Sequence, residues 1–507
     1  MQLDGKSLTL KSIQKELANP TRLSISKDAK TLVNKSRAVV DHILSTKKTV
    51  YGVNTGFGRM ANQRISSDKL EQLQVNLLRS HAAGTGEYLA PNTVRLILLL
   101  KINSLLRGYS GIRLIVIENL IFFYNQGLLP AIRERGSVGA SGDLAPLADL
   151  ALPLIGEGAF LNKSGGVESA EAILKSNGLH KIGLKEKEGL SLINGTQVST
   201  ALAIEALIKS IDLFYSINAA GAFSTEVMLG TDSAFREEIQ VARNQKGQIY
   251  AGKLLSQLMQ NSGFRAAHVY CDRVQDFYSI RCMPQVHGSL FELIQHAESI
   301  LVREANSTTD NPVTLIDENL IVSGGNFHAA PIAHILDYLA IALTDATAMS
   351  ERRIAAFQET TQSNLPMFLM KEAGLNSGFM IAHVTAAALT SENKSLAHPA
   401  SVDSIPTSAN QEDHVSMAPA AGYQLLQVIR NATTVISIEL MCAAQGKDLN
   451  SKYDLAANSE DIYQLIRMEV PYLTADGPLS EYIQYIDGQV ASGEIARIVA
   501  RNTQDLL

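Results

Sequence analysis

Residues 419–445 read PAAGYQLLQVIRNATTVISIELMCAAQ, and Arg430 and Glu439 are the only charged residues in this stretch. Its apolar residues would cover most of the circumference of a helix rather than one stripe, a pattern typical of helices surrounded by other helices. Four further stretches share this pattern: 196–220, 285–304, 329–354 and 379–397. The sequence therefore predicts a mainly α fold, with a large central bundle of long near-parallel helices.

Two of the apolar stretches are long enough to raise the question of a membrane. Residues 331–349 contain Asp337 and Asp345, and residues 425–445 contain Arg430 and Glu439. A membrane-spanning helix needs about 20 consecutive residues with few or no charges. We therefore interpret both as interior helices of the bundle.

The remainder of the chain predicts a smaller N-terminal α-rich domain. We expect this domain to span residues 1–110 and to carry a Gly-rich loop at Tyr51, and the bundle domain to span 111–507. Apolar residues recur at helical spacing in 29–44, 67–107, 113–126 and 144–155, and a hairpin is predicted at 158–167.

Composition restricts the classes of function. The chain has 507 residues, 46% hydrophobic and 19% charged, with a net charge of −6. This balance gives no reason to expect binding to nucleic acid or to a membrane surface. The cysteines Cys271, Cys282 and Cys442 form neither a disulfide framework nor a metal-ligand pattern. With no signal-peptide pattern at the start, we expect reduced thiols and a cytoplasmic protein.

The run Gly139-Ala140-Ser141-Gly142-Asp143-Leu144 can convert its own backbone into an electrophile. If the Gly142 nitrogen attacks the Ala140 carbonyl and two waters are lost, Ser141 becomes a dehydroalanine within a five-membered ring whose methylene an amine can attack. Gly142 has no Cβ to hinder this approach, and Asp143 is expected to cap a helix beginning at Leu144. The alternative is a helix-start turn that does not cyclise.

This run belongs to a series of motifs that resembles one family, the aromatic amino acid ammonia-lyases that form a methylidene-imidazolone from Ala-Ser-Gly. The similarity extends from about Tyr51 to Gln445. Its other motifs are YGVNTGFG at 51–58, NGT at 194–196, QDFYSIRC at 275–282, TDNP at 309–312, GGNFH at 324–328, LNSGFM at 375–380 and NQEDHVSM at 410–417.

The resemblance implies a cofactor and an assembly. The cofactor is a 4-methylidene-imidazol-5-one formed autocatalytically from Ala140-Ser141-Gly142, with neither a metal nor a dissociable cofactor. The assembly is a homotetramer in which several subunits contribute to each pocket.

The resemblance also implies roles for individual residues. Tyr51 is expected to act as the base at the substrate β-carbon. Asn194, Gln275 and Tyr278 would donate or accept neutral hydrogen bonds around the carboxylate and amine. The planar guanidinium of Arg281 can hold the substrate carboxylate bidentately. Phe327 would pack beside the electrophile.

Two positions indicate the substrate. The Ser80-His81 pair resembles histidine-selective members of the family, and the Glu412 carboxylate can accept the N–H of an imidazole ring. Facing a phenyl ring, the same carboxylate would be a buried charge without a partner. The expected reaction is non-oxidative elimination of ammonia from L-histidine to give trans-urocanate, the first step of histidine degradation. Phe277 is bulkier than the Pro or Ala expected there, which leaves its effect on the pocket open.

Two alternatives remain from the sequence. A tyrosine- or phenylalanine-directed lyase, or an aromatic 2,3-aminomutase, would use the same electrophile, whereas a non-enzymatic helical assembly protein would keep the fold without the ring. His328 and His414 lie within the family motifs and are candidates for contact with the site, and Cys271 is either a reactive thiol near the pocket or an inert buried one.

Overall fold

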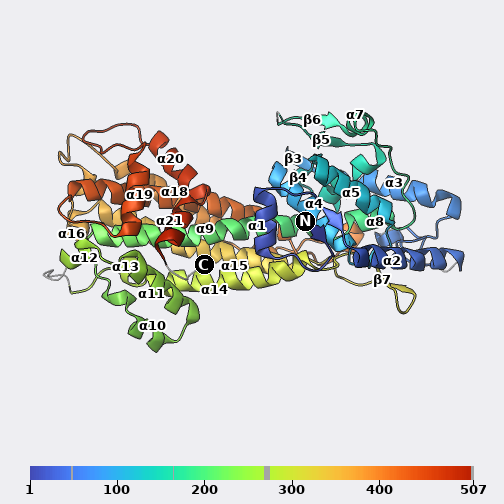
Figure 1. Ribbon diagram of the computed structural model, residues 1–507, viewed down its shortest axis with the longest axis horizontal. Helices are drawn as coiled ribbons and strands as arrows, with labels where there is room; N and C mark the ends of the chain where they lie inside the picture. The colour runs from blue at the N-terminus through green and yellow to red at the C-terminus, as the bar shows by residue number, and fades with distance from the viewer. Residues whose placement is uncertain (47–48, 57, 164, 268–273, 504–507) are drawn as a thin grey trace. The chain divides into compact units, whose positions relative to one another are not determined.

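The computed structural model describes residues 1–46, 49–56, 58–163, 165–267 and 274–503, so Phe57 and Cys271 lie outside the described residues. The chain forms two compact units (Figure 1). Unit 1 comprises residues 1–205, 298–336 and 399–423, and unit 2 comprises 206–297, 337–398 and 424–507. The boundary predicted at residue 110 lies inside unit 1. The chain passes between the units within four long helices and once more between residues 398 and 399.

Those four helices correspond to four of the apolar stretches from which the fold class was predicted. They are α9 (Gln197–Val227), α14 (Met283–Ala305), α15 (Ala330–Phe357) and α18 (Ala418–Leu449). Of these, α9 and α18 are the most completely buried. In α9 every residue from 213 to 227 is buried, as expected for a helix that is apolar on all sides. By length and composition α15 and α18 could cross a membrane, but 61% and 83% of their apolar windows are buried inside the protein, as in core helices.

Unit 1 is built mainly from shorter helices, several of which begin or end at residues suited to those positions. Pro91 occupies the first turn of α4, where the backbone N–H that proline lacks would have no partner within the helix. Gly127, in the left-handed conformation, ends α5. The remaining helices of unit 1 are α1 (Leu10–Ala18), α2 (Lys27–Ser45), α3 (Leu70–His81), α4 (Pro91–Leu105), α5 (Leu114–Gln126), α6 (Leu144–Ala151), α7 (Ala170–Ser176) and α8 (Glu188–Ile193), with short 3₁₀ turns at Gly58–Met60, Ser67–Lys69, Leu152–Ile155, Ala400–Val402 and Ser408–Asn410.

Four small two-stranded sheets complete unit 1. β1 (Gln2–Leu3) pairs in parallel with β2 (Ser24–Ile25), and the other three pairs are antiparallel. These are β3 (Thr85–Tyr88) with β4 (Arg133–Arg135), β5 (Ala159–Leu161) with β6 (Val167–Ser169), and β7 (Val313–Leu315) with β8 (Leu320–Val322). The β5–β6 pair is the hairpin that the sequence predicts at 158–167.

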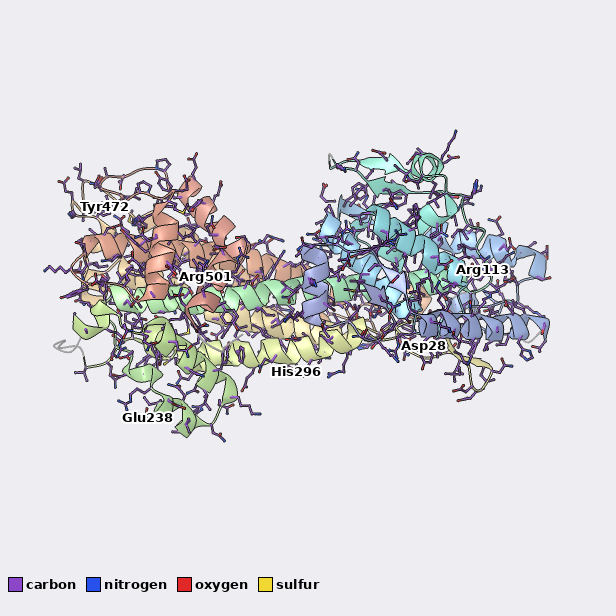
Figure 2. The ribbon with its side chains drawn as sticks, viewed as in Figure 1. Asp28, Arg113, Glu238, His296, Tyr472 and Arg501 are labelled. Atoms are coloured by element: carbon purple, nitrogen blue, oxygen red, sulfur yellow. The ribbon has the colours of Figure 1, made fainter. Side chains whose placement is uncertain are left out.

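Unit 2 contains the central and C-terminal helices. Charged side chains such as Glu238 on α10 project from its surface (Figure 2), and its core holds a fully buried ion pair between Arg353 on α15 and Glu439 on α18. Its other helices are α10 (Glu237–Arg243), α11 (Lys246–Leu258), α12 (Gly263–Ala267), α13 (Tyr278–Arg281), α16 (Thr360–Ser363), α17 (Met380–Leu396), α19 (Ala457–Arg467), α20 (Ser480–Ala491) and α21 (Glu494–Asn502), with 3₁₀ turns at Ser233–Phe235 and Met367–Leu369.

Candidate active site

A pocket of about 1110 Å³ lies within unit 1 and is lined by most of the residues that the sequence singles out. Segments far apart in the chain contribute to it: the loop after α2, the end of α3, the start of α6, the end of α8 and the turn before α18. The predicted site residues in its lining are Tyr51, His81, Ala140, Ser141, Asn194, Phe327 and Glu412.

The tripeptide lies against a second glycine-containing turn. Gly142 has a φ of +83° and pairs with Gly195 in an isolated parallel bridge. A Cβ on Gly142 would lie 2.3 Å from the Gly195 oxygen and 2.6 Å from its nitrogen. Both the backbone conformation and this close approach therefore require glycine at position 142.

Asp143 is the N-cap residue of α6, as predicted, but its side chain makes no capping hydrogen bond to this helix. The carboxylate accepts hydrogen bonds from the Ser199 backbone N–H and hydroxyl, both at 2.8 Å, and from the Ser137 hydroxyl at 3.0 Å. It therefore binds the N-terminal turn of α9, where a negative charge is favoured. Burial raises the pKa of Asp143, and the three hydrogen bonds act against that rise.

Asn194 joins the end of α8 to the tripeptide. Its side-chain amide Nδ2 donates to the Ser141 carbonyl oxygen at 3.0 Å, and its own carbonyl accepts from the Nζ of Lys101 at 2.7 Å. The side-chain Oδ1 is buried and has no hydrogen-bond partner among the described residues. A buried acceptor left in this state beside a pocket is suited to a ligand that donates a hydrogen bond.

Glu412 enters the pocket from a strained turn. Ser408, Ala409 and Asn410 have φ values of +51°, +53° and +61°, which cost non-glycine residues about 1–2 kcal/mol each. The turn places the Glu412 carboxylate so that Oε1 accepts from the Ser141 hydroxyl at 2.5 Å, while Oε2 accepts from Thr407 and Ser408 at 2.7 Å.

These contacts determine the charge of Glu412. Burial raises the pKa of the carboxyl, but hydrogen bonds from Ser141, Thr407 and Ser408 and the nearby His81 outweigh burial, so that the net pKa lies below its usual value. Glu412 is therefore ionised at neutral pH. Glu412 is predicted from the sequence, whereas Thr407 and Ser408 are not; their closeness to Glu412 in the chain is the signal that could have indicated them.

His81 lies at the C-terminal end of α3. Its Nδ1 lies 2.8 Å from the Leu77 carbonyl and 3.0 Å from the Ser80 hydroxyl, so the ring orientation is fixed by its own helix. Burial lowers the pKa of His81, and the Leu77 carbonyl and Glu412 act against that effect. The imidazole is consequently neutral at neutral pH and presents Nε2 for hydrogen bonding.

Tyr51 and Phe327 also line the pocket. The Tyr51 hydroxyl accepts a hydrogen bond from the Gly58 N–H at 3.3 Å, which connects the two ends of the Gly-rich loop. His414 lines the same pocket, and its ring stacks on that of His328 with centroids 5.7 Å apart. Among the described residues no group of three or more His, Cys, Asp or Glu could hold a metal ion.

The other three predicted residues belong to unit 2. Gln275 and Tyr278 are exposed, and the guanidinium of Arg281 lies over the Tyr278 ring, 4.5 Å from its centroid. The Arg281 Nε is buried without a hydrogen-bond partner in the described parts of the chain. Phe277, which departs from the family pattern, directly precedes α13 in this segment.

Fold and sequence together define the class of protein. The chain matches the family model for aromatic amino acid lyases over residues 8–468. It therefore belongs to the aromatic amino acid lyase family.

Individual relatives show which members of the family this chain resembles. The chain is 46% identical to the histidine ammonia-lyase of Idiomarina loihiensis over 499 residues, which cover 98% of each chain. The crystal structure of histidine ammonia-lyase from Trypanosoma cruzi superimposes with a TM-score of 0.91 at 40% identity, covering 99% of this chain and 96% of the other. Tyrosine aminomutase from Streptomyces globisporus superimposes with a TM-score of 0.94 at 32% identity, covering 99% of both chains.

Proposed function

We propose that this chain is a histidine ammonia-lyase that converts L-histidine to trans-urocanate and ammonia. The observation that carries the proposal is the 46% identity, over 98% of both chains, to a histidine ammonia-lyase. The identity to the tyrosine aminomutase is 32%. The pocket adds chemical support, because an ionised Glu412 and a neutral His81 line it together and both can hydrogen-bond to an imidazole.

The residues present fit the cofactor that the family implies. Gly142 has the positive φ and the absent Cβ that a tight backbone ring requires, and the Asn194 amide already binds the Ser141 carbonyl oxygen. We propose that Ala140, Ser141 and Gly142 form the 4-methylidene-imidazol-5-one, which supplies an electrophilic methylene to the substrate amine. The Asn194 N–H would stabilise negative charge that develops on the Ser141 oxygen.

Other residues of the pocket would each carry out one further part of the reaction. Tyr51 takes the proton from the substrate β-carbon, the step for which a positioned base is needed. Glu412 accepts the imidazole N–H and so selects histidine over tyrosine or phenylalanine. Phe327 excludes water beside the reacting atoms.

Gln275, Tyr278 and Arg281 are proposed to hold the substrate carboxylate and amine. Arg281 is suited to the carboxylate because its buried Nε has no partner within the described residues. We further propose that the enzyme is a homotetramer in which several subunits contribute to each pocket. Exposed apolar side chains of unit 2, on α15 and α17, support association between copies: Tyr338, Ile341, Ile381 and Val384.

The proposed compartment is the cytoplasm. Cys282 and Cys442 are free thiols, as expected of a protein in a reducing compartment.

The test combines two measurements on the purified full-length enzyme. L-Histidine, L-tyrosine and L-phenylalanine are each incubated with the enzyme and the products identified, while intact mass shows whether the chain has lost two waters. We expect urocanate and ammonia from histidine and a chain lighter by two waters. Coumarate from tyrosine without urocanate from histidine, or a β-amino acid product, would favour the alternative activities; an unshifted mass would favour a non-enzymatic protein.

A further inference from the structure

Lys101 is a buried lysine that the proposed reaction does not use. It lies in α4 within the continuously buried stretch 96–106 and is 1% exposed. Its Nζ donates to the Asn194 carbonyl at 2.7 Å and lies 3.4 Å from Oε1 of Gln197. No ion pair to Lys101 occurs among the residues described, so its hydrogen-bond partners are neutral.

A second buried lysine provides a comparison. Lys187 is also fully buried, but its Nζ lies 2.9 Å from the Asp310 carboxylate and 3.0 Å from the Ser191 hydroxyl. Its charge is therefore paired. Burial and the nearby charge of Lys187 lower the pKa of Lys101 to about 7, an effect that Asp310 and Asp143 only partly oppose. Keeping an ammonium at position 101 thus costs folding free energy, which the hydrogen bond to the Asn194 carbonyl offsets in part.

The carbonyl that Lys101 binds belongs to the Asn194–Gly195 peptide, which contacts the tripeptide Ala140-Ser141-Gly142. The Asn194 side chain donates to the Ser141 oxygen, the Gly195 oxygen accepts from the Asp143 N–H at 2.8 Å, and Gly195 pairs with Gly142. Helix α8 ends at this point, where its last carbonyls lack intrahelical donors. Lys101 supplies such a donor to the Asn194 carbonyl.

We infer that Lys101 is a positioning residue for ring formation: it fixes the Asn194–Gly195 peptide against Ser141 and Gly142, so that the Gly142 nitrogen is held within reach of the Ala140 carbonyl carbon. This inference rests on the proposed function, because it requires that the ring forms.

The chemistry that Lys101 would assist needs no further reactant. The Gly142 nitrogen forms a bond to the Ala140 carbonyl carbon, and that carbonyl oxygen leaves as water with the protons of the Gly142 and Ser141 nitrogens. The second water takes the Ser141 hydroxyl and the Ser141 Cα proton. Both losses depend on the geometry of one turn, and a misplacement of about 1 Å at such a centre costs about 10²-fold in rate.

The experiment compares Lys101→Met and Lys101→Gln with the control Lys187→Met in the full-length protein. Intact mass, followed over time after synthesis, gives the rate at which the two waters are lost; circular dichroism and thermal melting report folding. We expect both Lys101 variants to keep wild-type helicity and to lose the waters at least about 100-fold more slowly. Lys187→Met leaves Asp310 unpaired, so it should melt earlier, yet its folded fraction should mature at the wild-type rate.

The outcomes separate this inference from the proposed function. Lys101 variants that lose two waters at the wild-type rate would overturn the inference while leaving the proposed function intact. If neither Lys101 variant folds, the residue is structural and the inference also fails. A wild-type chain that never loses the waters would instead overturn the proposed function, and the role of Lys101 with it.

Discussion

Gly142→Ala is the perturbation whose effect can be worked most directly from the structure. The added Cβ would lie 2.3, 2.6 and 2.8 Å from the oxygen, nitrogen and carbonyl carbon of Gly195. A Cβ added to Gly195 would lie 2.5 Å from Oε1 of Gln197 and 2.9 Å from Oγ1 of Thr309, so neighbouring side chains limit how far Gly195 can move away. The methyl group therefore meets backbone that is itself confined.

The expected loss of stability has two parts. An alanine at a φ of +83° costs about 1–2 kcal/mol. Forcing a methyl group into a filled site typically costs about 1–3 kcal/mol more. The sum of about 2–5 kcal/mol is smaller than the usual folding free energy of about 5–15 kcal/mol. The variant should consequently fold, with a lower melting temperature, but with its turn displaced and its ring unformed.

A matched control separates the two parts. Gly127 ends α5 at a φ of +68°, and a Cβ there would meet nothing within 4 Å. Gly127→Ala should therefore show the conformational cost alone and mature fully. Thermal melting and intact mass are measured on both variants. If Gly142→Ala has the same melting temperature as Gly127→Ala and has lost both waters, the argument from the Gly195 contact is refuted.

Three further substitutions test individual roles. Ser141→Ala has no hydroxyl to eliminate, so it should fold and associate normally while activity falls by several orders of magnitude; near-normal turnover would contradict the mechanism. Tyr51→Phe should lower kcat about 10²–10⁴-fold, the range for a general base, with a chain that has still lost two waters by intact mass. Glu412→Gln should lower kcat/KM for histidine about 10–100-fold, as one charge-assisted hydrogen bond of about 1.5–3 kcal/mol is lost. Before Ser141 is dehydrated, the folded pKa of Glu412 lies below its ordinary value. Its stabilising effect in that uncyclised chain is present above the unfolded pKa of about 4.3 and is lost as pH falls through the folded pKa. Melting curves of the uncyclised Glu412→Gln chain should therefore differ less from those of the uncyclised wild type in acid.

The long helices and most of the pocket could be predicted because their signals are local or lie within short motifs. The five apolar stretches correspond to α9, α14, α15, α17 and α18; most of the predicted ends lie within four residues of the observed ones, but α9 continues seven residues beyond position 220. The domain boundary at residue 110 was harder, because each unit is assembled from three separate segments of chain. No composition shift marks a boundary that falls inside a continuous helix.

Contacts between distant segments account for what the sequence did not reveal. The position of Asp143 before a helix predicts a capping side chain, but its carboxylate instead binds Ser199, 56 positions later in the chain. Lys101 contacts Asn194, 93 positions away. The sequence nevertheless indicates that Lys101 is buried. The run LILLLKINSL from 96 to 105 is so apolar that a helix formed by it has no polar face on which the lysine could reach water.

The fold alone does not select the substrate, because a tyrosine aminomutase superimposes as well as a histidine ammonia-lyase does. The choice must therefore depend on side chains in the pocket, and Glu412 shows how the choice could be linked to ring formation. Its Oε2 is bound by Thr407 and Ser408, while its Oε1 is bound by the hydroxyl that Ser141 would lose in the proposed ring formation. Dehydration of Ser141 would thus remove the partner of Oε1 and leave an acceptor in the pocket without it. An imidazole N–H can satisfy that acceptor and a phenyl ring cannot, so the step that creates the electrophile would also favour histidine as its substrate.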